Sequence, residues 1–467
     1  MNYMIKINKN IFRAYDIRGI YPQDLNPKVA FKAALAFVDL YPKLEKIVLA
    51  HDTRKSSLPL ARAIKNALIQ AGKEVIFLNT APDPLFYFSI FHYKFDGGIM
   101  ISGSHNPKEY NGLTFHVRSK GDVVEKDLEK LKNLVLKERK FRIKKQGKIV
   151  KLNPRKDYLG YVIKKIRLKK PLRILIDSGN GAMGYLPEKV FKRLGCQVET
   201  IYADFDGNFP NHLPDPYEKK NRADAVKAVL KGKFDIGFVY DGDGDRVAVI
   251  DSKGRSVTGD FCFTMLARQV LETHSGPIVH DMRISQAFLN EMKERKIKTY
   301  FSVSHHSAVI KKIIKTKAVF GGEVTLHFLF PKDYYLGDDA LFASLKIAEI
   351  ASGKPSFAAY VDSLPRQEIS PEIFIPCADE VKFKIIKNLQ QLLRKQGYEF
   401  IDIDGARINF KHGWALCRAA NTTPIIKVRF EADTKKHLKE IEKESLELFG
   451  KAGVPLPKWI YRKLGLK

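Results

Sequence analysis

Short apolar runs alternate along most of the chain with longer segments in which apolar residues recur at helical spacing. This alternation is typical of α/β units built around mixed or parallel sheets. Helical spacing is clearest over residues 29–40, 58–71, 186–194 and 341–350. From about Pro371 the pattern changes to short strands over residues 374–376, 401–403, 414–417 and 425–430, followed by a charged helix over 435–449. We therefore predict a smaller α+β domain in the C-terminal part.

A repeated pattern divides the rest of the chain into three. Each repeat has an early strand that ends in an Asp-containing turn and a later strand that ends in a Gly-rich polar loop. The two strands begin near residues 46 and 95, 173 and 234, and 277 and 318. The gap between them, roughly 40 to 60 residues, leaves room for a β–helix–β crossover. The prediction is an α/β protein with three similar mixed-sheet domains (1–153, 154–254 and 255–367) and a C-terminal α+β domain (368–467).

Composition limits the class of protein. Apolar residues make up 45% of the 467 residues, as in ordinary globular proteins. No run approaches the roughly 18 apolar residues that a spanning helix needs, and the first residues lack the apolar stretch of a signal peptide. The four cysteines, Cys196, Cys262, Cys377 and Cys417, are widely spaced. This usage is typical of reduced thiols, so we expect a cytoplasmic protein with no membrane partner.

The net charge of +29 is unusual, because 81 Lys and Arg face only 52 Asp and Glu. Nucleic acid, an anionic membrane or an anionic small substrate would each suit such a charge. The lysines are dense between residues 126 and 173. No basic strand interleaved with aromatic residues and no helix-turn-helix signature accompanies them. We expect a solvated lysine-rich surface and no specific nucleic-acid partner.

The most specific motif is the loop Asp241-Gly-Asp-Gly-Asp-Arg246, which follows an apolar strand. Three carboxylates at alternate positions repel one another unless a cation lies between them. Oxygen ligands without His or Cys favour Mg²⁺ over zinc. An EF-hand does not fit, because Arg246 takes the place of its glycine and Ser252 the place of its glutamate. Asp241, Asp243 and Asp245 are thus candidate metal ligands, and Arg246 is suited to hold an anion shared with the metal.

A second loop carries Ser104 between Ser102 and His105. An acyl-transfer nucleophile is the first alternative, but the Gly-x-Ser-x-Gly pattern is missing and neighbouring side chains seldom point at each other. A serine that carries a phosphoryl group needs a metal and cationic groups to offset the charge of the transferring oxygens. The loop from Asp241 to Arg246 offers both. We therefore predict that Ser104 carries a phosphoryl group.

Two further loops have the composition of ligand-binding sites. Glu323, Thr325 and His327 alternate, so on a strand they would share one face and offer donors and acceptors to sugar hydroxyls. Hydrogen bonding inside a β-turn is the alternative. The run from Arg418 to Pro424 includes Asn421 and Thr422 and is a plausible phosphate site, with a solvated surface loop as the alternative.

These motifs together resemble the α-D-phosphohexomutase family, and most closely its bacterial phosphomannomutase/phosphoglucomutase branch. The resemblance extends nearly end to end. It rests on Phe12-Arg-Ala-Tyr-Asp-Ile-Arg-Gly19, the Ser-His-Asn-Pro loop with Tyr110-Asn-Gly112, Asp206-Gly-Asn-Phe-Pro-Asn-His-Leu-Pro-Asp-Pro216, the Asp241 loop, Gly322-Glu-Val-Thr-Leu-His327 and residues 418–424.

The resemblance implies four domains around a central cleft, one Mg²⁺, and transfer of a hexose phosphate between O1 and O6. The transfer uses a phosphoserine and a hexose 1,6-bisphosphate, which is both intermediate and activator. The implied catalytic residues are Ser104, Arg18, His105 and Arg246, and the implied metal ligands are Ser104, Asp241, Asp243 and Asp245. The implied substrate-binding residues are Tyr15, Arg283, His306, Glu323, Thr325, His327, Arg418, Asn421 and Thr422. The expected partner is a phosphorylated hexose, bound by a monomer or weak dimer.

The chain departs from the family pattern at four positions. Thr114 stands where the family commonly has a lysine proposed as acid/base, and a neutral threonine cannot replace an ammonium. Arg18, His105 and His306 remain as candidates for proton transfer. Ala420, Leu326 and Arg283 stand where Ser, Gly and Lys are common. Two alternatives follow, a catalytically weakened paralogue that binds a phosphosugar, and a mutase for another phosphosugar such as glucosamine phosphate.

Overall fold

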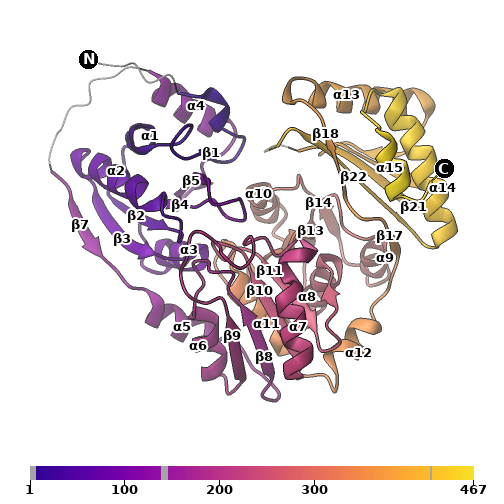
Figure 1. The fold of residues 1–467 in the computed structure, drawn as a ribbon, viewed down its shortest axis with the longest axis horizontal. Helices are drawn as coiled ribbons and strands as arrows, with labels where there is room; N and C mark the ends of the chain where they lie inside the picture. The colour runs from indigo at the N-terminus through magenta and orange to yellow at the C-terminus, as the bar shows by residue number, and fades with distance from the viewer. Residues whose placement is uncertain (1–6, 138–145, 421–422, 467) are drawn as a thin grey trace. The chain divides into compact units, whose positions relative to one another are not determined.

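The computed structural model describes residues 7–137, 146–420 and 423–466 (Figure 1). The chain divides into two compact units. The first unit contains Met1–Gln269 and Thr325–Asp362, and the second contains Val270–Val324 and Ser363–Lys467. Within the described part of the chain, no helix combines the length and the apolar character that crossing a bilayer requires.

The N-terminal sheet of the first unit has the order β1-β5-β4-β2-β3-β7, with β6 paired to β5. The strands β2, β3, β4 and β7 are parallel, whereas β5 is antiparallel to both β4 and β1. The strands are β1 (Ile17–Ile20), β2 (Lys46–His51), β3 (Glu74–Thr80), β4 (Gly97–Ile101), β5 (Tyr110–Val117), β6 (Gly121–Asp122) and β7 (Lys148–Lys151).

Helices pack on this sheet through apolar faces. They are α1 (Pro27–Leu40), α2 (Ser57–Gln70), α3 (Asp83–His92) and α4 (Lys126–Leu136), and a short 3₁₀ turn, η1 (Lys9–Ile11), precedes β1. The start of α1 follows from Asn26-Pro27, since Asn26 Oδ1 accepts hydrogen bonds from Lys28 N at 3.1 Å and Val29 N at 3.2 Å. The side chains of Phe37 and Ile64 join those of β2 and β4 in one buried cluster.

A second sheet in the first unit has the order β12-β11-β10-β8-β9. The strands β8, β9 and β10 are parallel, and β11 and β12 are antiparallel additions at one edge. Its strands are β8 (Arg173–Asp177), β9 (Gln197–Ile201), β10 (Ile236–Tyr240), β11 (Val247–Asp251) and β12 (Ser256–Val257). The accompanying helices are α5 (Arg155–Ile163), α6 (Leu186–Arg193), η2 (Lys219–Arg222), α7 (Ala223–Gly232) and α8 (Gly259–Thr273). The segment that returns to this unit contains α11 (Ala340–Ser352), α12 (Phe357–Asp362) and β16 (His327–Leu329), which is not a strand of this sheet.

The second unit begins with another parallel arrangement, in which β13 pairs with both β14 and β15. Its elements are β13 (Ile278–His280), α9 (Gln286–Glu294), β14 (Thr299–Phe301), α10 (His306–Thr316) and β15 (Phe320–Glu323). In all three repeats, the strand that ends in an Asp-containing turn is the parallel neighbour of the strand that ends in the polar loop (β2 with β4, β8 with β10, β13 with β15). The threefold pattern predicted from the sequence is therefore confirmed.

The turns after β2 and β13 also share their contacts. In His51-Asp52-Thr53-Arg54 and in His280-Asp281-Met282-Arg283, the aspartate Oδ1 accepts a hydrogen bond from the arginine backbone N at 3.0 Å. The guanidinium then pairs with Oδ2 of the same aspartate. In each turn, an aspartate thus binds both the backbone N–H and the guanidinium of the arginine two residues later.

The rest of the second unit is an antiparallel sheet with the order β17-β22-β21-β20-β19, and β18 also pairs with β22. Its strands are β17 (Glu368–Ile369), β18 (Ile373–Pro376), β19 (Phe400–Ile401), β20 (Ala406–Phe410), β21 (Gly413–Ala419) and β22 (Ile425–Ala432). Helices α13 (Asp379–Gln396) and α14 (Lys435–Lys451) cover one face (Figure 1), and α15 (Lys458–Lys463) follows. Leu389, Leu393 and Phe449 fill the space between helices and strands.

The other face of this sheet contacts the β13 segment through Arg407. Its guanidinium is 1% exposed, lies 4.0 Å from the centre of a ring of Trp414, and donates hydrogen bonds to Met282 O at 2.6 Å and Ile284 O at 2.8 Å. Charged donors of this kind hold backbone carbonyls firmly in a buried setting. The C-terminal sheet and the third repeat therefore form one unit.

Candidate active site

The Ser104 loop follows β4 and is held by residues that follow the neighbouring strand β2, in the turn before α2 and at the start of α2. The Asp52 carboxylate accepts hydrogen bonds from Gly103 N at 3.0 Å and Ser57 Oγ at 2.5 Å, and it pairs with Arg54 at 2.6 Å. Arg54 Nη2 in turn donates to Ser104 O at 3.1 Å. Burial alone would raise the pKa of Asp52, but the Arg54 charge and these hydrogen bonds lower it below its usual range. An ionised carboxylate and its arginine thus fix the loop.

Ser104 itself is 6% exposed and has a left-handed backbone with φ +48°. Its N–H donates to Ser102 Oγ at 2.8 Å, and its own Oγ lies 3.2 Å from Asp241 Oδ2. A non-glycine residue in this region costs of order 1 kcal/mol or more, so it persists only where surrounding contacts hold it. The loop contacts aim the serine at the acidic loop.

The acidic loop begins where β10 ends. Asp241 Oδ1 accepts hydrogen bonds from the backbone N–H groups of Gly244, Asp245 and Arg246 at 2.9, 3.1 and 3.2 Å. Gly244 has φ +79°, which lets the loop turn back on itself. Gly242 contributes in another way, because a Cβ there would lie 2.5 Å from Ser104 O. The two loops approach closely only because this position has no side chain.

The three carboxylates of this loop are buried together, with ligand atoms within 4.8 Å of one another. Burial, followed by the charges of Asp245 and Asp243, raises the pKa of Asp241. Burial and Asp245 also raise the pKa of Asp243 to about 6. For Asp245, burial is outweighed by His327 and Arg246, which lower its pKa. The group is therefore unfavourable as three charges without a cation.

The free oxygens of the cluster suit a hard cation. Among the described residues, Asp243 Oδ1 and Asp245 Oδ1 have no hydrogen-bond partner although both are buried. Asp243 Oδ2 accepts a 2.5 Å hydrogen bond from Ser102, which ties the acidic loop to the serine loop. An oxygen-only donor set is the kind that Mg²⁺ prefers. The predicted metal ligands therefore have a composition and spacing that fit the ion.

Two guanidinium groups and one imidazole lie near Ser104, and a second imidazole contacts one of these guanidinium groups. Arg246 Nη1 lies 2.8 Å from His105 Nδ1, and Arg246 Nε lies 3.1 Å from His327 Nε2. Arg18 pairs with Asp16 at 2.7 Å and donates to Gly103 O at 2.9 Å. The three predicted residues His105, Arg18 and Arg246 thus lie together with Ser104 in the first unit.

His105 differs from the sequence-based expectation. Neighbouring side chains were expected to point apart, yet Ser104 Oγ lies 3.1 Å from His105 Nδ1. The left-handed backbone at Ser104 turns the two side chains to the same side. Burial, followed by the charges of Arg246 and Arg18, holds the pKa of His105 well below its ordinary value. The imidazole is consequently neutral beside the serine.

The expectation of one strand through Glu323, Thr325 and His327 is wrong. The strand β15 ends at Glu323, and residues 324–326 form a turn before β16 begins at His327. Leu326, in this turn, has φ +78°, a conformation that favours glycine. The three side chains therefore do not alternate on one face, and His327 instead contacts Asp245 Oδ2 at 3.1 Å.

The remaining predicted residues fall into both units. Tyr15 is buried in the first unit before β1, and Thr325 lies in the turn before β16. In the second unit, Arg283 pairs with Glu323 at 3.3 Å, and His306 begins α10. Arg418 on β21 is 5% exposed and pairs with Asp404 at 3.1 Å. Asn421 and Thr422 lie outside the described residues.

Sequence reasoning missed a lysine beside the predicted phosphate loop. Lys382 on α13 is 2% exposed and donates to Ala420 O and to Thr423 O, the latter at 2.8 Å. It therefore holds the two residues that flank positions 421–422. No local motif signals this role, because the lysine lies about 40 residues earlier on a helix whose exposed face is rich in lysine.

Comparison with known proteins gives matches to four domain models along the chain. They are phosphoglucomutase/phosphomannomutase α/β/α domain I over residues 9–142, domain II over 156–254, domain III over 258–367 and the C-terminal domain over 372–448.

Individual relatives match over nearly their whole length. A phosphoglucomutase from Neisseria gonorrhoeae is 32% identical over 94% of this chain and 96% of its own. A phosphoglucosamine mutase from Methanocaldococcus jannaschii is 29% identical over 94% of this chain and 99% of its own. The crystal structure of a phosphoglucomutase/phosphomannomutase family protein from Burkholderia thailandensis is 30% identical, with a TM-score of 0.90 over 97% of this chain and 100% of that chain. The chain therefore belongs to the phosphoglucomutase/phosphomannomutase family.

Proposed function

We propose that this chain is a phosphohexomutase, an isomerase that interconverts hexose 6-phosphates and hexose 1-phosphates of glucose and mannose. The observation that carries the proposal is the placement of Ser104 Oγ 3.2 Å from Asp241, within a loop that offers three carboxylates and Arg246. Family membership supports the reaction type. The same placement supports Ser104 as the residue that carries the phosphoryl group.

The acidic loop would hold Mg²⁺ through Asp241, Asp243 and Asp245, with Ser104 or its phosphoryl group completing the ligands. When bound, the ion supplies positive charge that offsets the negative charge on the transferring phosphoryl oxygens. Ser102 supports this arrangement from the protein side, because its hydroxyl bonds to Asp243 while accepting from Ser104 N.

The side chains around Ser104 have distinct proposed tasks. In the first half-reaction the bond between phosphorus and Ser104 Oγ breaks, and a bond forms between phosphorus and the free hydroxyl oxygen of the sugar phosphate. The proton of that hydroxyl passes to Ser104 Oγ, so the step neither gains nor loses a proton overall. His105 Nδ1, at 3.1 Å from Oγ, is positioned to exchange this proton, while Arg246 and Arg18 donate hydrogen bonds to phosphoryl oxygens.

The product of this step is a hexose 1,6-bisphosphate, which must reorient before its other phosphate returns to Ser104. A distal phosphate site must therefore accept either end of the sugar. We propose Arg418, with Asn421 and Thr422, as that site. Tyr15, Arg283, His306, Glu323, Thr325 and His327 are the proposed contacts to the sugar. Two observations support the distal site, the burial of Arg418 and the Lys382 contacts to the flanking residues.

The state of the thiols supports the cellular compartment that we propose. All four cysteines, Cys196, Cys262, Cys377 and Cys417, are free and buried. Burial raises the pKa of Cys262 to about 12, so this thiol is unreactive. Such thiols suit the reducing cytoplasm, where we propose that the protein acts as a monomer or weak dimer.

The intact mass of the purified protein tests the proposal directly. We expect one phosphate-sized increment that disappears after incubation with excess glucose 6-phosphate, and that is never present in Ser104→Ala. Turnover with Mg²⁺ and glucose 1,6-bisphosphate should likewise be lost in this variant. A wild-type protein that neither carries the increment nor turns over any hexose phosphate would refute the proposal.

A mutase for amino sugars is the second candidate, because a relative of nearly equal length is named phosphoglucosamine mutase. The same assay distinguishes the two. A kcat/KM for glucosamine 6-phosphate at least about tenfold above those for glucose and mannose 6-phosphates would favour it, a discrimination of about 1.4 kcal/mol.

A further inference from the structure

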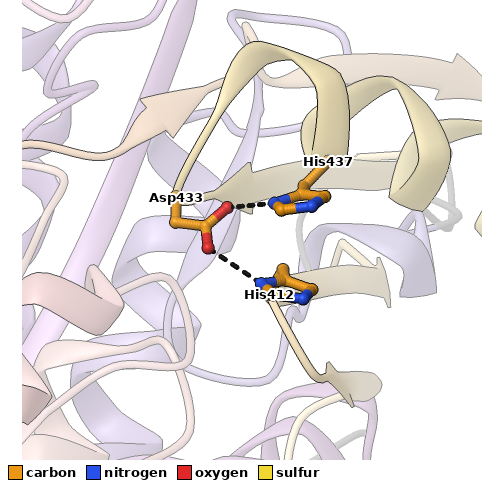
Figure 2. A group of neighbouring side chains, drawn as sticks. All are labelled: His412, Asp433 and His437. Carbon is orange, nitrogen blue, oxygen red and sulfur yellow. Dashed lines mark hydrogen bonds and ion pairs between the residues drawn. The ribbon is translucent and has the colours of Figure 1, made fainter.

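Three side chains lie close together on the surface of the second unit. The acidic loop belongs to the first unit and is far from them in the sequence. The three side chains are those of His412, Asp433 and His437 (Figure 2). His412 Nδ1 lies 2.9 Å from Asp433 Oδ2, and His437 Nδ1 lies 2.5 Å from Asp433 Oδ1. The two imidazole rings are stacked, with centroids 3.8 Å apart and an interplanar angle of 18°. Each oxygen of one carboxylate thus contacts a different histidine.

The backbone holds these positions independently of the side chains. His412 is in the two-residue turn between β20 and β21, where Phe410 pairs with Gly413. Asp433 follows β22, and its N–H donates to His412 O at 3.0 Å. Thr434 caps α14 by accepting from His437 N at 3.2 Å. A hairpin turn and a capped helix end therefore bring the three residues together before any ligand arrives.

The three side chains are also accessible to solvent. Their exposed fractions are 37% for His412, 45% for Asp433 and 26% for His437, so each can rotate without disturbing the core. One carboxylate thus lies between two partly exposed imidazole rings.

We propose that His412, Asp433 and His437 form a binding site for a transition-metal ion, with Zn²⁺ as the preferred occupant. Two imidazoles and one carboxylate are a common zinc donor set, with metal–ligand distances of about 2.0–2.2 Å and a fourth position left to water. The ligand atoms lie within 4.8 Å of one another, so one ion reaches all three once the nearly parallel rings turn toward it. Nitrogen ligands exclude Mg²⁺ as the occupant.

The acidic loop and the proposed His412–Asp433–His437 site therefore differ in chemistry. The acidic loop offers only oxygen, whereas the His412–Asp433–His437 cluster offers two nitrogens. Metal bound at the cluster would join the β20–β21 turn to the first turn of α14. Because it binds the folded state, it would stabilise the C-terminal part of the second unit by mass action.

Zinc titration of the full-length protein tests the proposal. The protein is first stripped with a chelator and then held in excess Mg²⁺, which saturates the acidic loop. Calorimetry should show one saturable Zn²⁺ site per chain, and Co²⁺ should give a visible absorption spectrum of nitrogen-ligated metal. Buried thiols do not compete, because all four cysteines are inaccessible.

Variants locate the site. His412→Ala and His437→Ala should each weaken Zn²⁺ binding by about 100-fold or more, since loss even of a supporting contact costs about 10–100-fold. His274→Ala removes a histidine elsewhere and should leave binding unchanged. Zinc should raise the unfolding temperature of the wild type and of His274→Ala, but not of the cluster variants.

Metal-free unfolding of each variant checks that it folds. Should a histidine variant be unfolded, Asp433→Asn, which keeps the shape of the side chain, must show the same loss. Zinc binding that persists within about threefold in the double variant His412→Ala/His437→Ala, or that is absent from the wild type, overturns the proposal.

Discussion

Replacement of Gly242 by alanine should separate the serine loop from the acidic loop. The added Cβ would lie 2.5 Å from Ser104 O, whereas ordinary contact begins at 3.4 Å, so the loops must part by about 0.9 Å. The carbonyl cannot yield alone, since Arg54 Nη2 holds it at 3.1 Å. Overpacking of this kind costs about 1–3 kcal/mol of stability. A displacement of about 1 Å between reacting groups lowers kcat by about 100-fold.

The assay compares kcat, KM and urea unfolding of Gly242→Ala with those of the wild type. We expect the loss in kcat, with a smaller change in KM, because the distal substrate contacts lie elsewhere. Gly160→Ala in α5 is the matched control, since nothing lies within 4 Å of a Cβ at that position. It should keep full activity and gain up to about 1 kcal/mol from helix propensity. Wild-type kcat in a folded Gly242→Ala protein would contradict the reasoning.

Three other substitutions test separate parts of the molecule. Asp243→Asn removes a buried carboxylate whose Oδ1 has no hydrogen-bond partner among the described residues. It should raise the Mg²⁺ concentration needed for half-maximal activity by about tenfold or more. An unchanged concentration would argue against Asp243 as a ligand. Burial opposes protonation of His212, but the hydrogen bond and the charge of Asp177 raise its pKa above 6.5. The stability that the His212–Asp177 pair contributes is therefore complete below pH 6.5, and it declines as pH rises through the pKa of His212 in the folded state. The difference in unfolding free energy between wild type and His212→Asn should therefore shrink above pH 6.5, and a difference that grows with pH would be the wrong sign. Arg407→Met removes a buried charge together with its two hydrogen bonds to backbone carbonyls, and should lower the free energy of unfolding of the second unit by about 3 kcal/mol in urea. A loss below about 1 kcal/mol would show that these hydrogen bonds contribute little.

Much of the fold was predictable because its signals are local. Apolar runs followed by Asp turns and Gly-rich loops identified the paired strands of all three repeats, and these strands are parallel neighbours. The acidic loop was recognisable for the same reason, since its three carboxylates lie within five consecutive residues. The strand β20 was not predicted, although Ala406–Phe410 alternates apolar and polar residues. Its Arg407 is buried, so the alternation does not mark an exposed face here.

What could not be predicted depends on contacts between distant residues or on backbone conformation. Arg54 holds Ser104 across 50 positions, and no spacing rule reports such a pair. The left-handed conformation of Ser104 brings His105 beside it, and that of Leu326 accompanies the turn where a strand was expected. Sequence alone gives few signs of a positive φ when the residue is not glycine or asparagine.

The shared turn after β2 and β13 has a consequence for how such a protein diversifies. Its Asp–Arg pair closes the turn by itself, and the same guanidinium reaches the loop of the adjacent strand, meeting Ser104 in one copy and Glu323 in the other. A duplicated domain thus inherits a support that is already stable. The supported loop carries a serine in one copy and a carboxylate in the other, while the turn itself keeps the same contacts. One contact between two side chains thus supports loops of different chemistry in two repeats of the same chain.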